Sequence, residues 1–356
     1  MPTTTQHAAF HHLRVAAIDE LTDDSVAITF DVPEELRTDY AFAHGQHLNI
    51  RGGDDVRRSY SICTPPSSGA LRIGVKRLPG GAFSQDVVGR LRIGDELEVS
   101  TPAGRFTTEL DPASARHYVA IAAGSGITPV LSILAAILEG EPGAFVTLIY
   151  ANRTSRSVMF LDEVHDLKDR HPERLQIIHV LSREPQDVEL LSGRLDADRL
   201  RGILEALIPA KEVDDWFLCG PQQMVDELRG VLTDAGATRI HSELFHADPV
   251  PRAPVASLVD GAEGAASVTI RLDGRASEFP LRPDDVGVLE AGLRVRSDLP
   301  FACRGGVCGT CRARLLEGTV QMDANYALEP DEIEKGYVLT CQSHPTSAKV
   351  VLDYDG

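Results

Sequence analysis

Short, β-prone apolar runs divided by Gly, Pro, Asp and Arg make up the first part of the chain. Short strands at near-regular spacing are typical of a small barrel. The strands are expected at Leu13–Ile18, Ser25–Phe30, Gln46–Ile50, Tyr60–Cys63, Leu71–Val75 and Glu96–Ser100. The pattern therefore predicts an antiparallel β-barrel domain over residues 1–112.

Residues 113–246 alternate between apolar strands and helical stretches. This alternation implies right-handed crossovers onto a parallel sheet. Strands are expected at Tyr118–Ala123, Phe145–Tyr150, Leu175–Leu181 and Trp216–Cys219, and helices at Pro129–Leu138, Phe160–Arg170 and Gln222–Ala235. The second segment is therefore predicted to be a Rossmann-like α/β domain.

A stretch rich first in Pro and then in Gly and Ala, residues 247–265, follows the second segment. Pro stiffens a chain and Gly loosens it, so this composition indicates a linker. The remaining residues, 266–356, open with a β-prone run at Ser267–Leu272 and contain four of the six cysteines. We expect a third domain over residues 266–356.

The four cysteines of this third segment follow a C-x4-C-x2-C spacing, then 29 residues, then the last cysteine; they are Cys303, Cys308, Cys311 and Cys341. That is the plant-type spacing for a [2Fe–2S] cluster. Glycines in the loop tolerate positive φ and let backbone N–H groups approach sulfur. Structural zinc is the alternative, but zinc usually uses paired C-x2-C knuckles and this loop has one. A structural disulfide pair is a further alternative, which suits an oxidising compartment.

Length and charge limit the classes of function. The chain has 356 residues, enough for two or three domains, and a formal net charge of −18. The acidic balance argues against nucleic acid and anionic membrane as partners. The uncharged stretch Val119–Leu138 contains two glycines and a proline, so a buried strand, turn and helix explains it better than a membrane span. No secretory signal is visible at the start, and we expect a cytoplasmic protein.

Two motifs in the first segment have the chemistry to bind a phosphate and an aromatic ring. In Arg58-Ser59-Tyr60-Ser61, Arg can clamp a phosphate, Tyr can lie against an aromatic ring and Ser can bond a ring nitrogen. The run from Gly80 to Ser84 is expected at a helix start, where backbone N–H groups attract a pyrophosphate. Residues of an ordinary strand edge and an ordinary N-terminal turn are the alternatives.

Two further motifs lie at strand ends of the second segment. The run from Gly124 to Pro129 follows a buried strand and precedes a helix, as a dinucleotide turn does. Cys219-Gly220-Pro221 ends the last expected strand of the same sheet, where the thiol could touch a nicotinamide. A buried, inert cysteine is the alternative.

These motifs, in this order and followed by the cysteine loop, resemble the ferredoxin–NADP reductase superfamily with a plant-type ferredoxin appended. Within it, the chain most resembles the reductase subunits of phenylacetyl-CoA epoxidases. That finer resemblance rests on Tyr150–Thr154, Phe301–Cys308, Asn325–Glu332 and Gly336–Gln342. It implies three domains: an FAD-binding β-barrel, an NADP-binding Rossmann-like sheet and a β-grasp [2Fe–2S] ferredoxin.

The resemblance also implies roles for individual residues. Arg58 would bind the FAD pyrophosphate, Tyr60 would stack on the isoalloxazine and Ser61 would approach flavin N5. Tyr60, Ser61 and Cys219 would form the hydride-transfer site, with Glu243 beside the flavin. The residues implied to bind FAD or the nicotinamide nucleotide are Arg58, Ser59, Tyr60, Ser61, Gly81, Ala82, Phe83, Ser84, Gly124, Gly126, Thr128, Ser182, Arg183 and Phe245.

Ser182 and Arg183 follow the third strand, where NADPH-specific relatives hold the 2′-phosphate. An Arg and a hydroxyl suit a dianion, so NADPH is expected, with a merely solvated Arg183 as the alternative. The resemblance implies that electrons pass from NADPH through FAD and the cluster to a di-iron oxygenase in phenylacetate degradation. A reductase for a Rieske-type ring or steroid hydroxylase, and a simple ferredoxin-like carrier or redox sensor, are the alternative functions.

Overall fold

The computed structural model describes residues 9–52, 57–78, 82–246, 266–282 and 285–356. It contains two compact units, one spanning Phe10–Phe245 and the other containing the described residues after Phe245. The first unit holds both the predicted barrel and the predicted α/β segment. The predicted linker, 247–265, lies outside the described residues.

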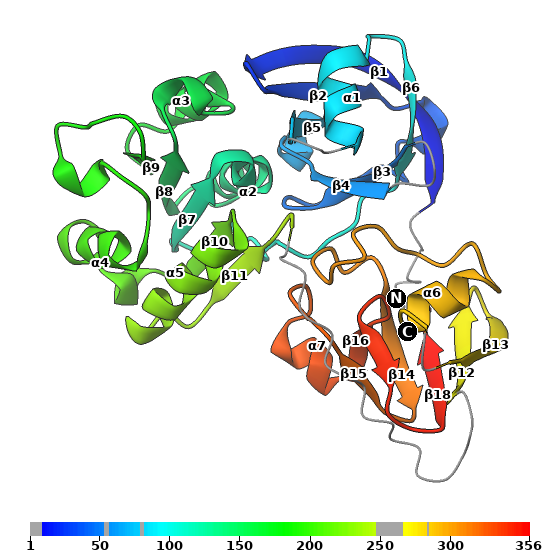
Figure 1. Cartoon of the computed structure of the whole chain (residues 1–356). Helices are drawn as coiled ribbons and strands as arrows, with labels where there is room; N and C mark the ends of the chain where they lie inside the picture. The colour runs from blue at the N-terminus through cyan, green and yellow to red at the C-terminus, as the bar shows by residue number, and fades with distance from the viewer. Residues whose placement is uncertain (1–8, 53–56, 79–81, 247–265, 283–284) are drawn as a thin grey trace. The chain divides into compact units, whose positions relative to one another are not determined.

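The first six strands form one antiparallel sheet that closes into a barrel (Figure 1). The strands are β1 (Phe10–Thr22), β2 (Ser25–Asp31), β3 (His47–Arg51), β4 (Arg57–Ser61), β5 (Leu71–Lys76) and β6 (Glu96–Ser100), in the order β4-β3-β6-β1-β2-β5. The two edge strands meet just beyond β4, where Ile62 pairs with Ile73 of β5 and the Cys63 N–H donates to the Arg72 carbonyl at 2.9 Å. Helix α1 (Ala82–Arg90) follows β5.

The fourth strand differs from its prediction, which placed it at Tyr60–Cys63. The residues of β4, Arg57 to Ser61, are mostly polar, so they carry no apolar run that could mark a strand. They form a strand because they pair with β3, residue for residue, from His47 opposite Ser61 to Arg51 opposite Arg57. After Ser61 the chain turns toward β5. The apolar Ile62 and Cys63 pair with β5 and close the barrel, and they are not part of β4.

A five-stranded parallel sheet forms the rest of the first unit. Its strands are β7 (His117–Ala123), β8 (Phe145–Asn152), β9 (Leu175–Leu181), β10 (Asp215–Cys219) and β11 (Ile240–Glu243), in the order β11-β10-β7-β8-β9. Its helices are α2 (Ile127–Gly140), α3 (Leu161–Arg170), α4 (Ala197–Ala206) and α5 (Gln222–Asp234). Helices α2 and α3 cover one face, and α4 and α5 the other (Figure 1). Strands β8 and β9 are added on one side of β7, and β10 and β11 on its other side. The order of strands therefore reverses between β7 and β10, which is the position where doubly wound sheets bind ligands.

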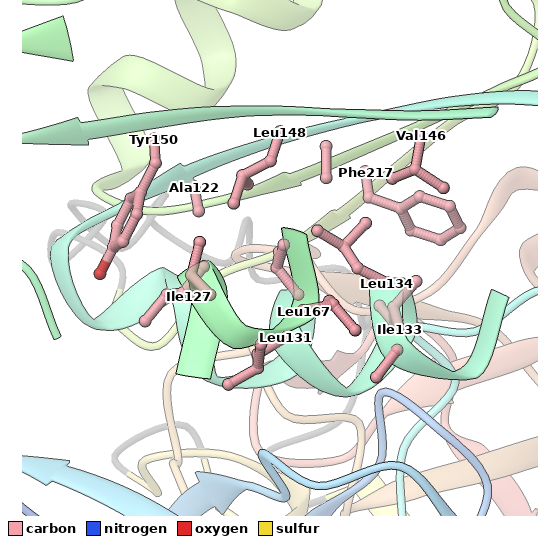
Figure 2. Packing of buried hydrophobic residues seen from close by; sticks show 14 of the residues in the cluster. Ala122, Ile127, Leu131, Ile133, Leu134, Val146, Leu148, Tyr150, Leu167 and Phe217 are labelled. Atoms are coloured by element: carbon pink, nitrogen blue, oxygen red, sulfur yellow. The ribbon is translucent and has the colours of Figure 1, made fainter. Parts of the chain in front are cut away.

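The uncharged stretch seen in the sequence becomes β7 and the buried helix α2. Every residue from Ile127 to Leu138 is buried. Figure 2 shows Ile127, Leu131 and Leu134 of α2 packed under the sheet. The charge-free sequence is therefore explained by burial inside the sheet domain. Among the described residues, no helix is both long and apolar enough to span a bilayer.

The second unit is a mixed sheet that packs against a short helix. Its elements are β12 (Ala266–Leu272), β13 (Arg275–Leu281), α6 (Val288–Leu293), β14 (Arg312–Glu317), β15 (Val320–Met322), α7 (Pro330–Glu334), β16 (Tyr337–Leu339), β17 (Ser343–Pro345) and β18 (Lys349–Asp353). The main sheet has the order β13-β12-β18-β14-β16, with β12 and β18 parallel and the other pairs antiparallel. Val288 and Leu289 of α6 pack into its core. This is the β-grasp arrangement.

Short 3-10 turns complete the connections. They are η1 (Glu34–Leu36), η3 (Pro66–Ser68), η4 (Gly124–Gly126), η5 (Ser155–Ser157), η6 (Glu189–Leu191) and η7 (Ala210–Glu212).

Candidate functional site

The turn between β7 and α2 lies at the reversal point of the parallel sheet. Gly124 has φ +53°, in the left-handed region that favours glycine. A Cβ atom on Gly126 would lie 2.1 Å from the Cys219 carbonyl oxygen, so only glycine fits against the end of β10. The Tyr150 hydroxyl donates to the Gly124 carbonyl at 3.1 Å, and Figure 2 shows it pointing toward the start of α2. The result is a fixed turn at a helix start, which suits a diphosphate.

The barrel packs closely against this turn. A Cβ atom on Gly74 of β5 would lie 2.6 Å from the Thr128 methyl group and 2.9 Å from the Phe160 ring. Thr128 is buried, and its hydroxyl donates to the Ser125 carbonyl at 3.1 Å. The predicted flavin-binding and nicotinamide-binding surfaces are therefore held together within one compact unit.

Two of the expected hydride-transfer residues, Ser61 and Cys219, lie on different strands and each neighbours Glu243, which was expected beside the flavin. Cys219 ends β10 and lies opposite Glu243 in the register of β10 with β11. The Ser61 hydroxyl, at the end of β4, donates to Glu243 Oε2 at 3.0 Å. Ser61 is 2% exposed and Cys219 is fully buried. The barrel and the parallel sheet thus each contribute to one buried polar cluster.

The electrostatics of this cluster keep its thiol and its imidazole uncharged. Burial raises the pKa of the Cys219 thiol well above its ordinary value, and the Glu243 carboxylate raises that pKa further. His47 Nδ1 lies 3.9 Å from Glu243 Oε1, and burial lowers the pKa of His47 to about 4. Cys219 is therefore a neutral S–H group near neutral pH and not a thiolate nucleophile. His47 was not expected from the sequence, because a single His on a strand gives no signal.

Tyr60 offers the aromatic surface on the barrel side. Its ring centroid lies 5.6 Å from that of Phe83 in α1, with 38° between the ring planes. Both rings rest against the barrel core. Burial raises the pKa of Tyr60, so its hydroxyl stays protonated.

The other expected flavin-binding residues of the barrel lie on β4 beside Tyr60 and on α1. Arg58 is exposed and donates from Nη1 to the Arg57 carbonyl at 2.8 Å. Ser59 donates to Asn49 Oδ1 at 2.7 Å, and the buried Ser84 hydroxyl accepts the Leu78 N–H at 3.1 Å. The expected helix start is present, since α1 begins at Ala82, whereas Gly81 lies outside the described residues. A half-buried ring, an exposed guanidinium and a helix start fit a flavin nucleotide.

Ser182 and Arg183 extend the pairing at the carboxyl end of β9. The Ser182 N–H donates to the Asn152 carbonyl at 2.9 Å, and the Arg183 N–H to the Arg153 carbonyl at 2.8 Å. Both Ser182 and Arg183 are exposed. The next residue, Glu184, accepts the Ser155 N–H and hydroxyl at 2.8 and 3.0 Å. The Glu184 carboxylate therefore already accepts two hydrogen bonds from Ser155. The expected Phe245 is 40% exposed at the end of this unit.

The four cysteines of the second unit lie close together: Cys308 and Cys341 affect the pKa of Cys303, and Cys341, Cys308 and Cys303 affect the pKa of Cys311. The Gly305 N–H donates to Cys303 Sγ at 3.4 Å. Among the residues described, no three His, Cys, Asp or Glu side chains converge as ligands of a single metal ion would. Four neighbouring thiols, with the Gly305 N–H aimed at the Cys303 sulfur, fit a binuclear cluster held by four thiolates.

The cysteine loop has one conformational feature that its sequence does not reveal. Arg304 has φ +54°, which is uncommon for a residue with a side chain. Its guanidinium lies 4.5 Å from the centre of the Phe301 ring, and its Nε lies 3.4 Å from Glu290. Gly306 and Gly309 also have positive φ, as expected for this loop. The tight winding therefore depends on contacts of Arg304 as well as on glycine.

Three domain families match the chain in the order of its segments. The oxidoreductase FAD-binding domain matches residues 12–108, the oxidoreductase NAD-binding domain residues 120–229 and the 2Fe-2S iron–sulfur cluster binding domain residues 270–346. The fold and the sites therefore define a flavin- and nicotinamide-dependent oxidoreductase with its own [2Fe–2S] domain. These matches confirm the expected cofactor classes and favour the cluster over the zinc and disulfide alternatives.

Two known proteins are similar over almost the whole chain. A component of the 1,2-phenylacetyl-CoA epoxidase from Escherichia coli (strain K12) is 43% identical over 351 residues, 97% of this chain and 98% of that protein. The ferredoxin reductase component of 3-ketosteroid-9-alpha-monooxygenase from Rhodococcus rhodochrous is 35% identical over 354 residues, 96% of each. The chain belongs to this family of flavin and iron–sulfur reductases.

A solved structure supports the same conclusion about architecture. Phthalate dioxygenase reductase, described as a modular structure for electron transfer from pyridine nucleotides to [2Fe–2S], matches with a TM-score of 0.60 and 25% identity. The match covers 97% of this chain and 98% of that chain. The predicted barrel, Rossmann-like sheet and ferredoxin domain are confirmed. A simple ferredoxin-like carrier does not account for the FAD- and NAD-binding domains.

Proposed function

We propose that this chain is the NADPH-dependent reductase of a phenylacetyl-CoA epoxidase and delivers electrons to a di-iron oxygenase in the cytoplasm. The observation that carries this assignment is the 43% identity, over 97% of the chain, with the component of the Escherichia coli epoxidase. The 35% identity with a 3-ketosteroid-9-alpha-monooxygenase component supports a second candidate, a reductase for a Rieske-type hydroxylase. Both candidates share one electron path.

When bound, the nicotinamide supplies a hydride, FAD converts it to single electrons and the cluster carries one electron at a time. The chain's task is to hold these groups in line. Arg58 binds the flavin pyrophosphate, together with Gly81 and with Ala82 and Ser84 of α1. The rings of Tyr60 and Phe83 support the isoalloxazine, with Ser59 and Phe245 beside it.

In this proposal, hydride transfer takes place beside the group of side chains formed by Ser61, Cys219 and Glu243. The Ser61 hydroxyl, which donates to Glu243 at 3.0 Å, connects the flavin edge to a carboxylate that can hold a proton. The neutral Cys219 thiol borders the nicotinamide without attacking it. Gly124, Gly126 and Thr128 form the turn that receives the nicotinamide nucleotide's diphosphate.

NADPH is the proposed electron donor because of the residues after β9. Ser182 and Arg183 are exposed at the strand end, where an adenosine ribose would lie. Glu184, which could otherwise favour a free 2′-hydroxyl, is hydrogen-bonded to Ser155. A guanidinium and a hydroxyl suit the dianionic 2′-phosphate of NADPH.

The iron–sulfur ligands in this proposal are Cys303, Cys308, Cys311 and Cys341. The four thiols lie close enough to affect one another's pKa, which supports a single cluster that all four would hold.

A pull-down tests the partner. The tagged full chain is used as bait in lysate from cells of the source organism grown on phenylacetate, and captured proteins are identified by mass spectrometry. Capture of di-iron oxygenase subunits, absent from a matched culture grown on succinate, supports the epoxidase assignment. Capture of a Rieske oxygenase instead contradicts that assignment. In that case the proposed path through FAD and the cluster remains.

Reconstitution separates the two pathways independently. The purified reductase is mixed with purified di-iron oxygenase of the epoxidase or with a Rieske steroid hydroxylase, and NADPH oxidation coupled to product is measured. We expect coupled turnover only with the di-iron oxygenase. Uncoupled NADPH oxidation with both oxygenases would contradict the partner assignment.

A further inference from the structure

Gln342 directly follows Cys341, and its side chain contacts both ends of the cysteine site. Its Nε2 donates to the Arg304 carbonyl at 2.9 Å, across 38 positions of sequence. The same Nε2 lies 3.2 Å from the Cys341 carbonyl and 3.5 Å from Cys341 Sγ. One amide group therefore links the cysteine loop at 303–311 to the fourth cysteine.

The orientation of this amide is determined by its surroundings. Its three contacts are two carbonyl oxygens and one sulfur, which are all acceptors. Turning the amide over would place its oxygen against all three, so Nε2 is the atom that faces them.

The position of the side chain is also fixed by packing. A Cβ atom on Gly306 would lie 3.2 Å from Gln342 Cγ and 3.3 Å from the Ala324 carbonyl oxygen. The Gln342 backbone is held on both sides, by its N–H to the Leu339 carbonyl and by its carbonyl to the Asp323 N–H, each at 2.9 Å. The amide therefore has little freedom to turn away from the sulfur.

An N–H group aimed at a cysteine sulfur affects the two redox states of a cluster differently. Reduction adds one negative charge, which is spread over the sulfur ligands. A donor near sulfur stabilises the reduced state more than the oxidised state, and hydrogen bonds to sulfur and side chains behind metal ligands are known to tune potentials. A donor here should make the cluster easier to reduce.

We propose that Gln342 is a positioning residue that raises the reduction potential of the [2Fe–2S] cluster by donating an N–H to the Cys341 sulfur and tying it to the loop at Arg304. The inference rests on the proposed cysteine ligands. It gives Gln342 a role in electron transfer from the flavin to the cluster, because the cluster's potential sets how far that transfer proceeds.

The test is an EPR-monitored redox titration of the full-length protein with two variants. Gln342→Met keeps the length of the side chain and removes the N–H donor. We expect the ratio of reduced to oxidised cluster at a given solution potential to fall by about tenfold, a shift of 59 mV for one electron. Gln342→Lys keeps N–H donors and adds a positive charge, so its cluster should be as easy to reduce as the wild-type cluster, or easier.

Gln321→Met is the matched control, because Gln321 lies exposed on β15 of the same unit. It should leave the potential unchanged. Equal potentials in the wild type and Gln342→Met would overturn the proposal. So would loss of the cluster from both Gln342 variants, since Gln342 would then act only as a structural link.

Iron and sulfide content keeps this result separate from the ligand assignment. Wild-type protein should hold two irons per chain, and Cys341→Ala should lose the cluster. If those results hold while the Gln342 variants show no shift, the ligand assignment stands and only the tuning role fails. If Cys341→Ala keeps a normal cluster, the ligand assignment itself is wrong.

Discussion

At the scale of single residues, Ser61 connects the barrel to the parallel sheet. Its hydroxyl donates to Glu243, which belongs to a strand 182 positions further along the chain. Replacing Ser61 by Ala leaves Glu243 without this donor and removes a hydroxyl from the proposed flavin edge. We expect flavin reduction by NADPH in a stopped-flow experiment to slow by about a hundredfold.

Ser68→Ala is the control for this substitution, because Ser68 is exposed and its hydroxyl donates only locally, to the Pro65 carbonyl. Its flavin reduction should match the wild type. A wild-type rate in Ser61→Ala with FAD bound would show that the Ser61–Glu243 pair plays no part in hydride transfer.

The buried imidazole of His47 predicts a pH dependence of stability. His47 is 4% exposed, and burial lowers its pKa from 6.5 to about 4. As pH falls below 6.5, His47 is protonated in the unfolded chain but stays neutral in the folded chain. The free energy of unfolding therefore decreases as pH falls from 6.5 to about 4. The full loss is about 3 kcal/mol.

His47→Gln cannot take up that proton and isolates its contribution. The chain's one Trp, Trp216, lies in the same unit and reports its urea unfolding by fluorescence. Between about pH 7 and pH 5 the wild type should lose about 2 kcal/mol more than His47→Gln. Parallel pH curves for the two proteins would contradict the assigned pKa.

At the scale of elements, the packing of the β7–α2 turn against β10 gives a steric prediction. In Gly126→Ala the new methyl group would lie 2.1 Å from the Cys219 carbonyl oxygen, a backbone atom that cannot rotate away. We expect a loss of about 2 kcal/mol of stability. The KM for NADPH should also rise, because the turn must move from the end of β10.

Gly230→Ala is the matched control. Gly230 lies inside α5, and a Cβ atom there would meet nothing within 4 Å. Alanine in a helix interior should be neutral or stabilising by up to about 1 kcal/mol. If Gly126→Ala behaves like Gly230→Ala, the close approach of the turn to β10 is wrong.

The carboxyl end of β9 gives a prediction of nucleotide preference. Arg183→Ala removes the positive charge proposed to meet the 2′-phosphate. It should lower kcat/KM for NADPH by about tenfold to a hundredfold, which corresponds to the loss of one charge–charge interaction at a protein surface. The kcat/KM for NADH should stay unchanged, since NADH has no 2′-phosphate. Arg170→Ala, on the exposed end of α3, is the control. An equal loss with both nucleotides would contradict a 2′-phosphate contact.

Elements with a dense apolar signal could be predicted closely from the sequence. Strand β9 has the predicted bounds, and β7 and α2 follow from the charge-free stretch. Helix α4 was missed, although Asp196 caps it and Leu200 and Ile203 are buried three positions apart. All four residues of strand β11 are half-buried and only Ile240 among them is apolar, so only the pairing with β10 makes this segment a strand.

The candidate sites show the same division between local and long-range information. Three of the four proposed cluster ligands, Cys303, Cys308 and Cys311, could be proposed from the sequence because their spacing within one loop is a local property. The contact of Ser61 with Glu243, the burial of His47 and the reach of Gln342 to Arg304 depend on how distant segments pack. No pattern along the sequence encodes those contacts.

At the scale of the whole molecule, the chain contains two compact units, each with one half of the proposed electron path. The unit Phe10–Phe245 holds the residues proposed to bind flavin and nicotinamide, and the other holds the four cysteines. If each unit carries one step, reduction of the flavin by NADPH can proceed without transfer of electrons to the iron–sulfur cluster. Removing the cluster should therefore leave reduction of the flavin intact.

The most direct test is stopped-flow reduction of the full-length Cys308→Ser variant by NADPH, with Cys63→Ser as control. Cys63 is a buried thiol of the barrel that donates to the Arg72 carbonyl at 3.3 Å. We expect Cys308→Ser to lose the cluster's EPR signal while its flavin is reduced at a rate within about twofold of wild type, and Cys63→Ser to keep both. Loss of flavin reduction in Cys308→Ser, with FAD still bound, would contradict the order from NADPH through FAD to the cluster.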